Sequence, residues 1–101
     1  MQGQGACIKI IENLKQSQDP KTLIVINPQN QEDLEFLNII ENYEDVIDQD
    51  TLVLDITKCS DIVGVLDIKE TPAVFVVENG NIEFKGVAEE GLLKIVDEGE
   101  S

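Results

Sequence analysis

The segment Thr22–Asn27, with the sequence TLIVIN, constrains the fold more than any other part of the chain. It is rich in β-branched residues and shows no alternation with polar residues, a pattern typical of a strand covered on both faces of a sheet. Thr51–Thr57 and Ala73–Val77 are further strand-like runs. A strand covered on both faces needs helices on both sides, so the sequence predicts an α/β fold.

Apolar residues recur at three- and four-residue steps in three segments, the spacing of one buried helical face. The residues predicted to point inward are Cys7, Ile8, Ile11 and Leu14 in the first segment, Leu34, Leu37 and Ile40 in the second, and Leu92, Leu93 and Val96 in the third. Asn30 is placed to cap the second helix, and Gly99 to end the third. A shorter helical turn, capped by Ser60 or Asp61, is expected to run through Val65.

Asn79-Gly80 stands between the strand-like runs Ala73–Val77 and Asn81–Lys85. This dipeptide is the strongest short-range signal for a β-hairpin, because a type I′ turn needs positive φ at both central residues. The predicted order is therefore αβαβαββα, with the first two strands parallel and joined by a right-handed crossover. We expect one domain over residues 1–101, built as a four-stranded mixed sheet with helices on both faces.

The charge balance limits the chemistry open to the chain. Seven basic and 21 acidic residues give a formal net charge of −14, every cation is Lys, and there is no Arg or His. Such a chain repels a phosphate backbone, so we expect no nucleic-acid partner. Without His there is no Ser/His or Cys/His catalytic pair and no imidazole metal ligand, so we expect no metal or other cofactor.

The sequence also lacks the signals of a membrane or exported protein. No apolar run approaches the roughly 20 residues that span a bilayer. Met1–Gly5 carries no basic region leading into an apolar stretch, and the acidic composition disfavours anionic membranes. We therefore expect a cytoplasmic protein with no membrane partner.

Most of the negative charge lies between Lys21 and Lys58, where there is no cation. If the second helix extends far enough, its side away from Leu37 and Ile40 becomes a continuous acidic face. The residues of this face are Glu41, Glu44, Asp45 and Asp48. Two interpretations stay open: a solvated face that keeps a small protein soluble, and a docking surface for a basic protein.

Cys7 and Cys59 are the two cysteines of the chain. They are too few and too far apart in the sequence for a disulfide framework or a zinc site, so we expect free thiols. Cys7 lies on the apolar stripe of the first helix and should pack as a small hydrophobe. Cys59 follows Lys58 at the start of a short helix, where a thiolate is favoured; the alternative is an inert thiol beside a loop.

The C-terminal third resembles thioredoxin, on the residues Thr71-Pro72-Ala73-Val74-Phe75-Val76-Val77-Glu78-Asn79-Gly80. Lys85-Gly86-Val87-Ala88 and Gly91-Leu92-Leu93-Lys94 are similar to the glycine-bearing loop and last helix of that family. Thr51–Ile68 is similar to its middle strand, short helix and loop. The resemblance covers roughly Leu23 to Val96 and implies a thioredoxin-like fold without the family's first edge strand.

The resemblance breaks at the family's active-site motif. Where thioredoxins carry Trp-Cys-Gly-Pro-Cys, this sequence reads Pro28-Gln29-Asn30-Gln31-Glu32-Asp33-Leu34-Glu35. Ile26 stands at the position of the family's buried acidic residue. A dithiol exchange cycle needs an attacking thiolate and a nearby resolving thiol, so the ordinary thioredoxin reaction is not expected.

The resemblance further implies a cis peptide bond between Thr71 and Pro72 and a groove that accepts an extended peptide. The residues expected to bind a partner there are Asn30, Gln31, Thr71, Pro72 and Val87. In the thioredoxin fold the first and third helices pack on one face of the sheet, so Cys7 and Cys59 are possible neighbours. A disulfide between them requires Cα atoms within about 7 Å.

These observations favour a thioredoxin-like protein without dithiol oxidoreductase activity. We expect it to act as a protein-binding, scaffold or chaperone module whose partner is a basic protein or peptide. The alternative is a thiol-redox protein that works through Cys59, alone or paired with Cys7. A hydrolase or transferase has no support, because no pair of nucleophile and base can be assembled. The identity of the partner and the oligomeric state do not follow from the sequence.

Overall fold

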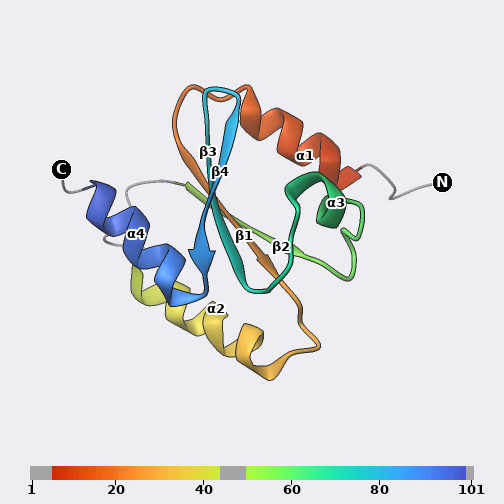
Figure 1. The fold of residues 1–101 in the computed structure, drawn as a ribbon, viewed down its shortest axis with the longest axis vertical. Coiled ribbons are helices and arrows are strands. Elements are labelled where there is room, and N and C mark those ends of the chain that lie inside the picture. The colour runs from red at the N-terminus through yellow and green to blue at the C-terminus, as the bar shows by residue number, and fades with distance from the viewer. Residues whose placement is uncertain (1–5, 44–49, 100–101) are drawn as a thin grey trace.

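The computed structural model describes residues 6–43 and 50–99, and its elements follow the predicted order (Figure 1). The helices are α1 (Ala6–Lys15), α2 (Gln31–Tyr43), α3 (Ile62–Leu66) and α4 (Glu89–Gly99). The strands are β1 (Lys21–Ile26), β2 (Asp50–Asp55), β3 (Ala73–Glu78) and β4 (Asn81–Val87). None of the described helices is long and apolar enough to cross a membrane.

The strands form one mixed sheet in the order β2-β1-β3-β4. β1 runs parallel to β2 and antiparallel to β3, and β3 pairs antiparallel with β4. The turn between β3 and β4 has positive φ at both Asn79 (52°) and Gly80 (85°). The predicted mixed sheet and the predicted hairpin are therefore confirmed.

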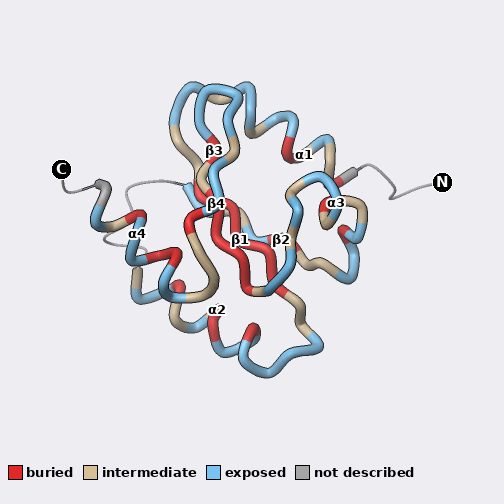
Figure 2. The backbone as a smooth tube through the Cα atoms, viewed as in Figure 1, coloured by how far each residue is buried: buried red, intermediate tan, exposed pale blue. Residues whose placement is uncertain are grey.

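Two hydrophobic cores lie on opposite faces of the sheet. Leu23 and Val25 of β1 pack with residues of α1 and α3, whereas Ile24 and Ile26 pack with residues of α2 and α4. Strands β1 and β3 are buried along most of their length (Figure 2). The unbroken apolar run of β1 thus reflects burial on both faces, as the sequence pattern predicted.

The inward faces of two helices differ from the prediction. Leu34 and Leu93 are 43% and 47% exposed. In α2 the buried residues are Asp33, Phe36 and Ile40, so the inward stripe begins one residue earlier than expected. The cause is Asp33, whose carboxylate turns inward to accept a hydrogen bond from the backbone N–H of Asn27.

In α4 the inward positions are Gly91, Leu92 and Ile95. With the helix in this rotation Leu93 points to solvent, since residues 92 and 95 share the inward face and residue 93 lies about 100° away from residue 92. The predicted short helix is present as α3, and Asp61 stands at its N-cap position. The Asp61 side chain makes no capping hydrogen bond to that helix.

Gly91 lets α4 lie directly on β3 and on the end of β4. A Cβ atom at Gly91 would stand 2.6 Å from the Cβ of Val74 and 2.9 Å from the carbonyl oxygen of Gly86. Real Cβ atoms do not approach other heavy atoms so closely, and neither neighbour is the end of a flexible side chain. The packing of the last helix therefore depends on the missing side chain.

We expect Gly91→Ala to lower the free energy of unfolding by about 1–3 kcal/mol, the usual cost of overpacking a close contact. The matched control is Gly64→Ala in α3, where an added Cβ meets nothing within 4 Å. That change should be neutral or stabilising, because alanine favours a helix over glycine by about 1 kcal/mol. Urea unfolding of both variants measures the difference, and equal midpoints would contradict the packing argument.

Candidate functional site

The pairing of the strands brings several predicted site residues to one end of the sheet. Ala73 is paired with Val25 on one side and with Val87 on the other. The segment Thr71–Pro72, which precedes Ala73, therefore lies at the same sheet end as Val87. Asn30 and Gln31 follow β1 beyond this end, at the start of α2. The residues predicted from the resemblance thus belong to one region of the molecule.

The centre of this region is the Thr71–Pro72 peptide bond, which is cis, as the resemblance implied. Pro72 is buried, and its carbonyl oxygen accepts a hydrogen bond of 2.8 Å from the backbone N–H of Ala88. This bond fixes the loop before β3 against the loop before α4. Thr71 and Val87 are half-buried, whereas Asn30 and Gln31 are exposed.

Hydrogen bonds within the chain connect the end of β1 to the first turn of α2. Asp33 is 1% exposed, and its Oδ2 accepts the backbone N–H of Asn27 at 2.8 Å. The backbone N–H of Gln29 donates to the side-chain oxygen of Asn27 at 3.0 Å, and the carbonyl oxygen of Asn30 accepts the N–H of Leu34 at 3.2 Å. The stretch where the resemblance places a dithiol thus contains the carboxylate of Asp33, which is hydrogen-bonded to the backbone of the same segment. The sequence has no Cys between Cys7 and Cys59.

A depression of about 400 Å³ lies beside Val87, between the segment that follows α3 and strand β4. Its lining residues are Leu66, Asp67, Ile68, Lys69, Glu70, Ala73, Phe75, Phe84 and Val87. Phe84 is 55% exposed, and its ring centroid is 5.4 Å from that of Phe75. This is an open apolar surface next to the predicted groove.

Phe84 and the segment 66–70 were not predicted from the sequence to be functional. The alternation of Ile82 and Phe84 with Glu83 and Lys85 indicates a strand with one apolar face. The same alternation is found in strands whose apolar face is fully covered. Only the position of β4 at the edge of the sheet leaves Phe84 uncovered.

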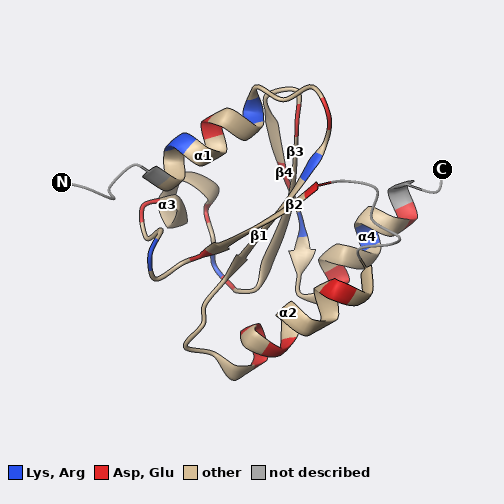
Figure 3. Ribbon diagram, turned by 180° about the vertical axis from the view of Figure 1, so that it is seen from behind, with Lys and Arg blue, Asp and Glu red and all other residues tan. Residues whose placement is uncertain are grey.

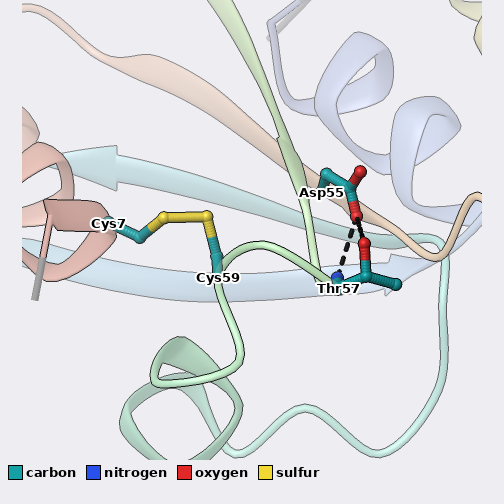
Figure 4. Close-up of a disulfide and its surroundings, with 4 residues drawn as sticks. All are labelled: Cys7, Asp55, Thr57 and Cys59. Carbon is teal, nitrogen blue, oxygen red and sulfur yellow. Dashed lines mark hydrogen bonds between the residues drawn. A yellow bond between two sulfur atoms is a disulfide. The ribbon is translucent and has the colours of Figure 1, made fainter. Parts of the chain in front are cut away.

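The two cysteines are joined, which corrects the prediction of free thiols. A disulfide links Cys7, in the first turn of α1, to Cys59, in the segment before α3 (Figure 4). The Cα atoms are 5.6 Å apart, within the range a disulfide requires. The prediction of free thiols rested in part on the 52 residues that separate the two cysteines in the sequence. Packing of α1 and α3 on one face of the sheet brings the cysteines together.

The turn that carries Cys59 is tied to the end of β2. The side chain of Asp55 accepts hydrogen bonds from the backbone N–H and the hydroxyl of Thr57, at 2.8 and 2.6 Å (Figure 4). The hydrogen bond from the hydroxyl holds the pKa of the Asp55 carboxyl below its ordinary value. The backbone N–H groups of Lys58 and Cys59 donate to the Asp55 carbonyl oxygen. The turn thereby places Cys59 next to Cys7 of α1.

We expect loss of the disulfide to lower the free energy of unfolding by about 2–4 kcal/mol, because the bond restricts the unfolded chain. Urea unfolding with and without dithiothreitol measures this difference. The double variant Cys7→Ala/Cys59→Ala is the control and should not respond to the reductant. A wild-type midpoint that is the same under both conditions would show that the bond does not stabilise the protein.

The predicted acidic face falls largely outside the described residues. Glu41 is exposed on α2, while Glu44, Asp45 and Asp48 lie outside residues 6–43 and 50–99. Carboxylates nevertheless gather on α2 and α4 (Figure 3). The hydroxyl of Tyr43 donates a 2.7 Å hydrogen bond to Glu89, which joins the two helices and raises the pKa of Tyr43.

Across residues 6–43 and 50–99, no group of three or more Cys, His, Asp or Glu side chains is arranged to hold a metal ion. The candidate site is the open end of the sheet, formed by the loop around Thr71–Pro72, the residues near Val87 and the depression beside Phe84. Such a surface offers backbone and apolar contacts.

Comparison with solved structures supports the fold. The chain superposes on thioredoxin from Trypanosoma brucei brucei with a TM-score of 0.78 at 12% identity, over 92% of this chain and 84% of that one. Thioredoxin from Schistosoma mansoni gives 0.75 at 12%, over 96% and 90%. The zinc-bound form of human ERp44 gives 0.70 at 20% identity, over 92% of this chain but 29% of that chain.

No family model matches the sequence, and no curated protein matches it closely enough to count as a relative. At identities of 12–20%, the structural likeness shows the fold alone. The chain therefore has a thioredoxin-like α/β fold, as the resemblance implied.

Proposed function

We propose that this protein is a thioredoxin-like binding module that holds an extended segment of a basic protein without exchanging thiols with it. The observation that carries the proposal is the open depression of about 400 Å³ next to Val87 and the Thr71–Pro72 loop. Extended segments bind to such surfaces through backbone hydrogen bonds, while their side chains enter neighbouring pockets.

The absence of thiols at the sheet end supports a binding role over catalysis. Thiol exchange requires a thiolate that can reach the bound disulfide. The stretch before and at the start of α2 has no Cys, and its buried carboxylate, Asp33, already binds the backbone of Asn27. Cys7 and Cys59 are buried and bonded to each other. A segment bound beside Val87 would therefore meet no reactive sulfur.

The charge of the chain supports a basic partner. The formal net charge is −14, and α2 carries four carboxylates and no lysine. Charge of one sign raises the rate at which oppositely charged partners associate. The acidic docking face that includes Glu41 contributes to this attraction. Acidic partners would be repelled by the same field.

We expect a basic unfolded polypeptide to bind, and an acidic one of similar length not to bind, in fluorescence titrations at low salt. Val87→Lys should weaken binding about tenfold, because it adds a like charge to the site and removes apolar contact. The matched control is Val53→Lys on β2, a 39% exposed valine at the opposite edge of the sheet. Equal loss in both variants would show attraction by overall charge without a site at Val87.

A second candidate function, thiol redox through Cys59 and Cys7, is favoured by the disulfide itself. Disulfides are uncommon in cytosolic proteins, where reductants keep thiols reduced. If the predicted cytoplasmic location holds, the bond would be exposed to those reductants. In an oxidising compartment the same bond would serve as a structural link.

We expect no acceleration of insulin reduction by dithiothreitol, because Cys7 and Cys59 are buried, at 7% and 4% exposure, and attack on their disulfide is hindered. The precipitation of reduced insulin measures the rate, with Cys59→Ala as the control. A rate above the uncatalysed one that disappears in Cys59→Ala would favour the redox function over simple binding.

A further inference from the structure

Phe84 stands between two depressions along the outer strand of the sheet. The first is the depression of about 400 Å³ already described, and the second measures about 320 Å³. Both are lined by Leu66, Phe75 and Phe84, and the second also by Val65 and Lys15. Val65 is 51% exposed, so two large apolar side chains face solvent on this side of the sheet.

The outer edge of β4 is available for pairing. In the sheet formed by the described residues, β4 is the last strand and pairs with β3 alone. Its register with β3 is regular from Asn81 to Phe84, and the irregularity lies beyond, opposite Val74 and Phe75. An edge strand with unpaired backbone groups accepts a further strand.

The two faces of β4 differ in character. Ile82 and Phe84 are paired with Val77 and Phe75, which belong to the core on the α1 and α3 side. Glu83 is paired with Val76, which packs with the core on the α2 and α4 side. Cross-strand partners share a face, so β4 is apolar on the first side and acidic on the second.

Helix α4 extends the acidic side. It packs on β4 and β3, and its exposed carboxylates Glu89, Glu90 and Asp97 outnumber its exposed lysine, Lys94. The two depressions on the other side are lined mainly by apolar side chains, and the charges beside them are mixed, with Lys15 in the second depression and Asp67, Lys69 and Glu70 in the first. Apolar residues of a partner are therefore favoured next to Phe84, and basic residues next to the carboxylates of α4.

We propose that β4 accepts, as an additional strand, an extended segment of a partner protein in which apolar residues alternate with Lys or Arg. Successive side chains of a strand point to opposite faces. The apolar residues would cover Phe84 and enter the two depressions, and the basic residues would face Glu83 and α4. This inference rests on the proposed binding function and assigns it a partner chemistry and a second surface.

A second copy of the chain fits this edge less well. Two copies with a net charge of −14 each repel one another. The charged residues of the strand itself are Glu83 and Lys85, and Lys85 is buried with its Nζ 3.2 Å from Glu83. A two-fold pairing of β4 would bring a second Glu83 to the edge without an exposed cation on either strand.

The test uses three synthetic peptides of about ten residues, long enough for one strand. The first alternates Leu with Lys, the second has the same composition with the Leu and Lys residues in two blocks, and the third alternates Leu with Glu. Binding is measured by fluorescence anisotropy, and the contact surface by amide shifts in NMR spectra. The alternating Leu/Lys peptide should bind at least about tenfold more tightly than the other two.

Phe84→Ser should weaken binding of the alternating Leu/Lys peptide about tenfold, because the partner loses its central apolar contact. Val65→Ser is a second variant at the groove and should weaken binding in the same direction. Val53→Ser is the matched control, since Val53 is 39% exposed but lies on β2, at the opposite edge of the sheet. Circular dichroism verifies that each variant is folded.

The expected amide shifts fall in residues 66–70 and 81–84, and the wild-type protein should remain monomeric without peptide in analytical ultracentrifugation. Equal binding of the block peptide, or equal loss in Val53→Ser, would overturn the proposal in favour of unspecific attraction. A dimer that Phe84→Ser disrupts would overturn it in favour of self-association. Shifts confined to Asn30, Gln31 and Val87 would overturn the proposal that β4 accepts a strand, while leaving the proposed binding function intact. If no basic polypeptide binds, both the strand proposal and the proposed binding function are overturned.

Discussion

Burial of β1 and β3 on both faces is the constraint on which the rest of the structure depends. Leu23, Ile24 and Val25 are fully covered, as are Val74 and Val77. Alternate residues of one strand face different helices, so substitutions at neighbouring positions of β1 affect different cores. This arrangement requires helices above and below the sheet and leaves the outer strands β2 and β4 only partly covered.

The same arrangement determines where interaction surfaces can form. Since β1 and β3 are antiparallel, the end of one and the start of the other meet, and the loops around Asn30 and Thr71 lie at one end of the sheet. Since β4 is an edge strand, Phe84 remains open. The central strands thus provide stability, while the sheet end and the outer strand β4 provide contact surfaces. The disulfide links α1 to the segment before α3.

Sequence patterns predicted the order of the elements and the hairpin turn correctly. The first predicted helix forms as α1 with Cys7 and Ile11 buried, and the Asn79-Gly80 hairpin forms with the expected positive φ angles. The rotation of α2 was wrong, because Leu34 and Asp33 compete for the inward position. The hydrophobicity of Leu34 favoured one rotation, but the hydrogen bond from Asn27 to Asp33 stabilises the other.

The sequence by itself determined the order of elements, the covered character of β1, the acidic charge and the absence of a dithiol at the start of α2. These properties depend on composition or on residues a few positions apart. Only the tertiary structure decided that Cys7 meets Cys59, that β4 is an edge and that Phe84 stands between two depressions. Such contacts join segments that are distant in the sequence, and their distances are set by how the helices pack on the sheet.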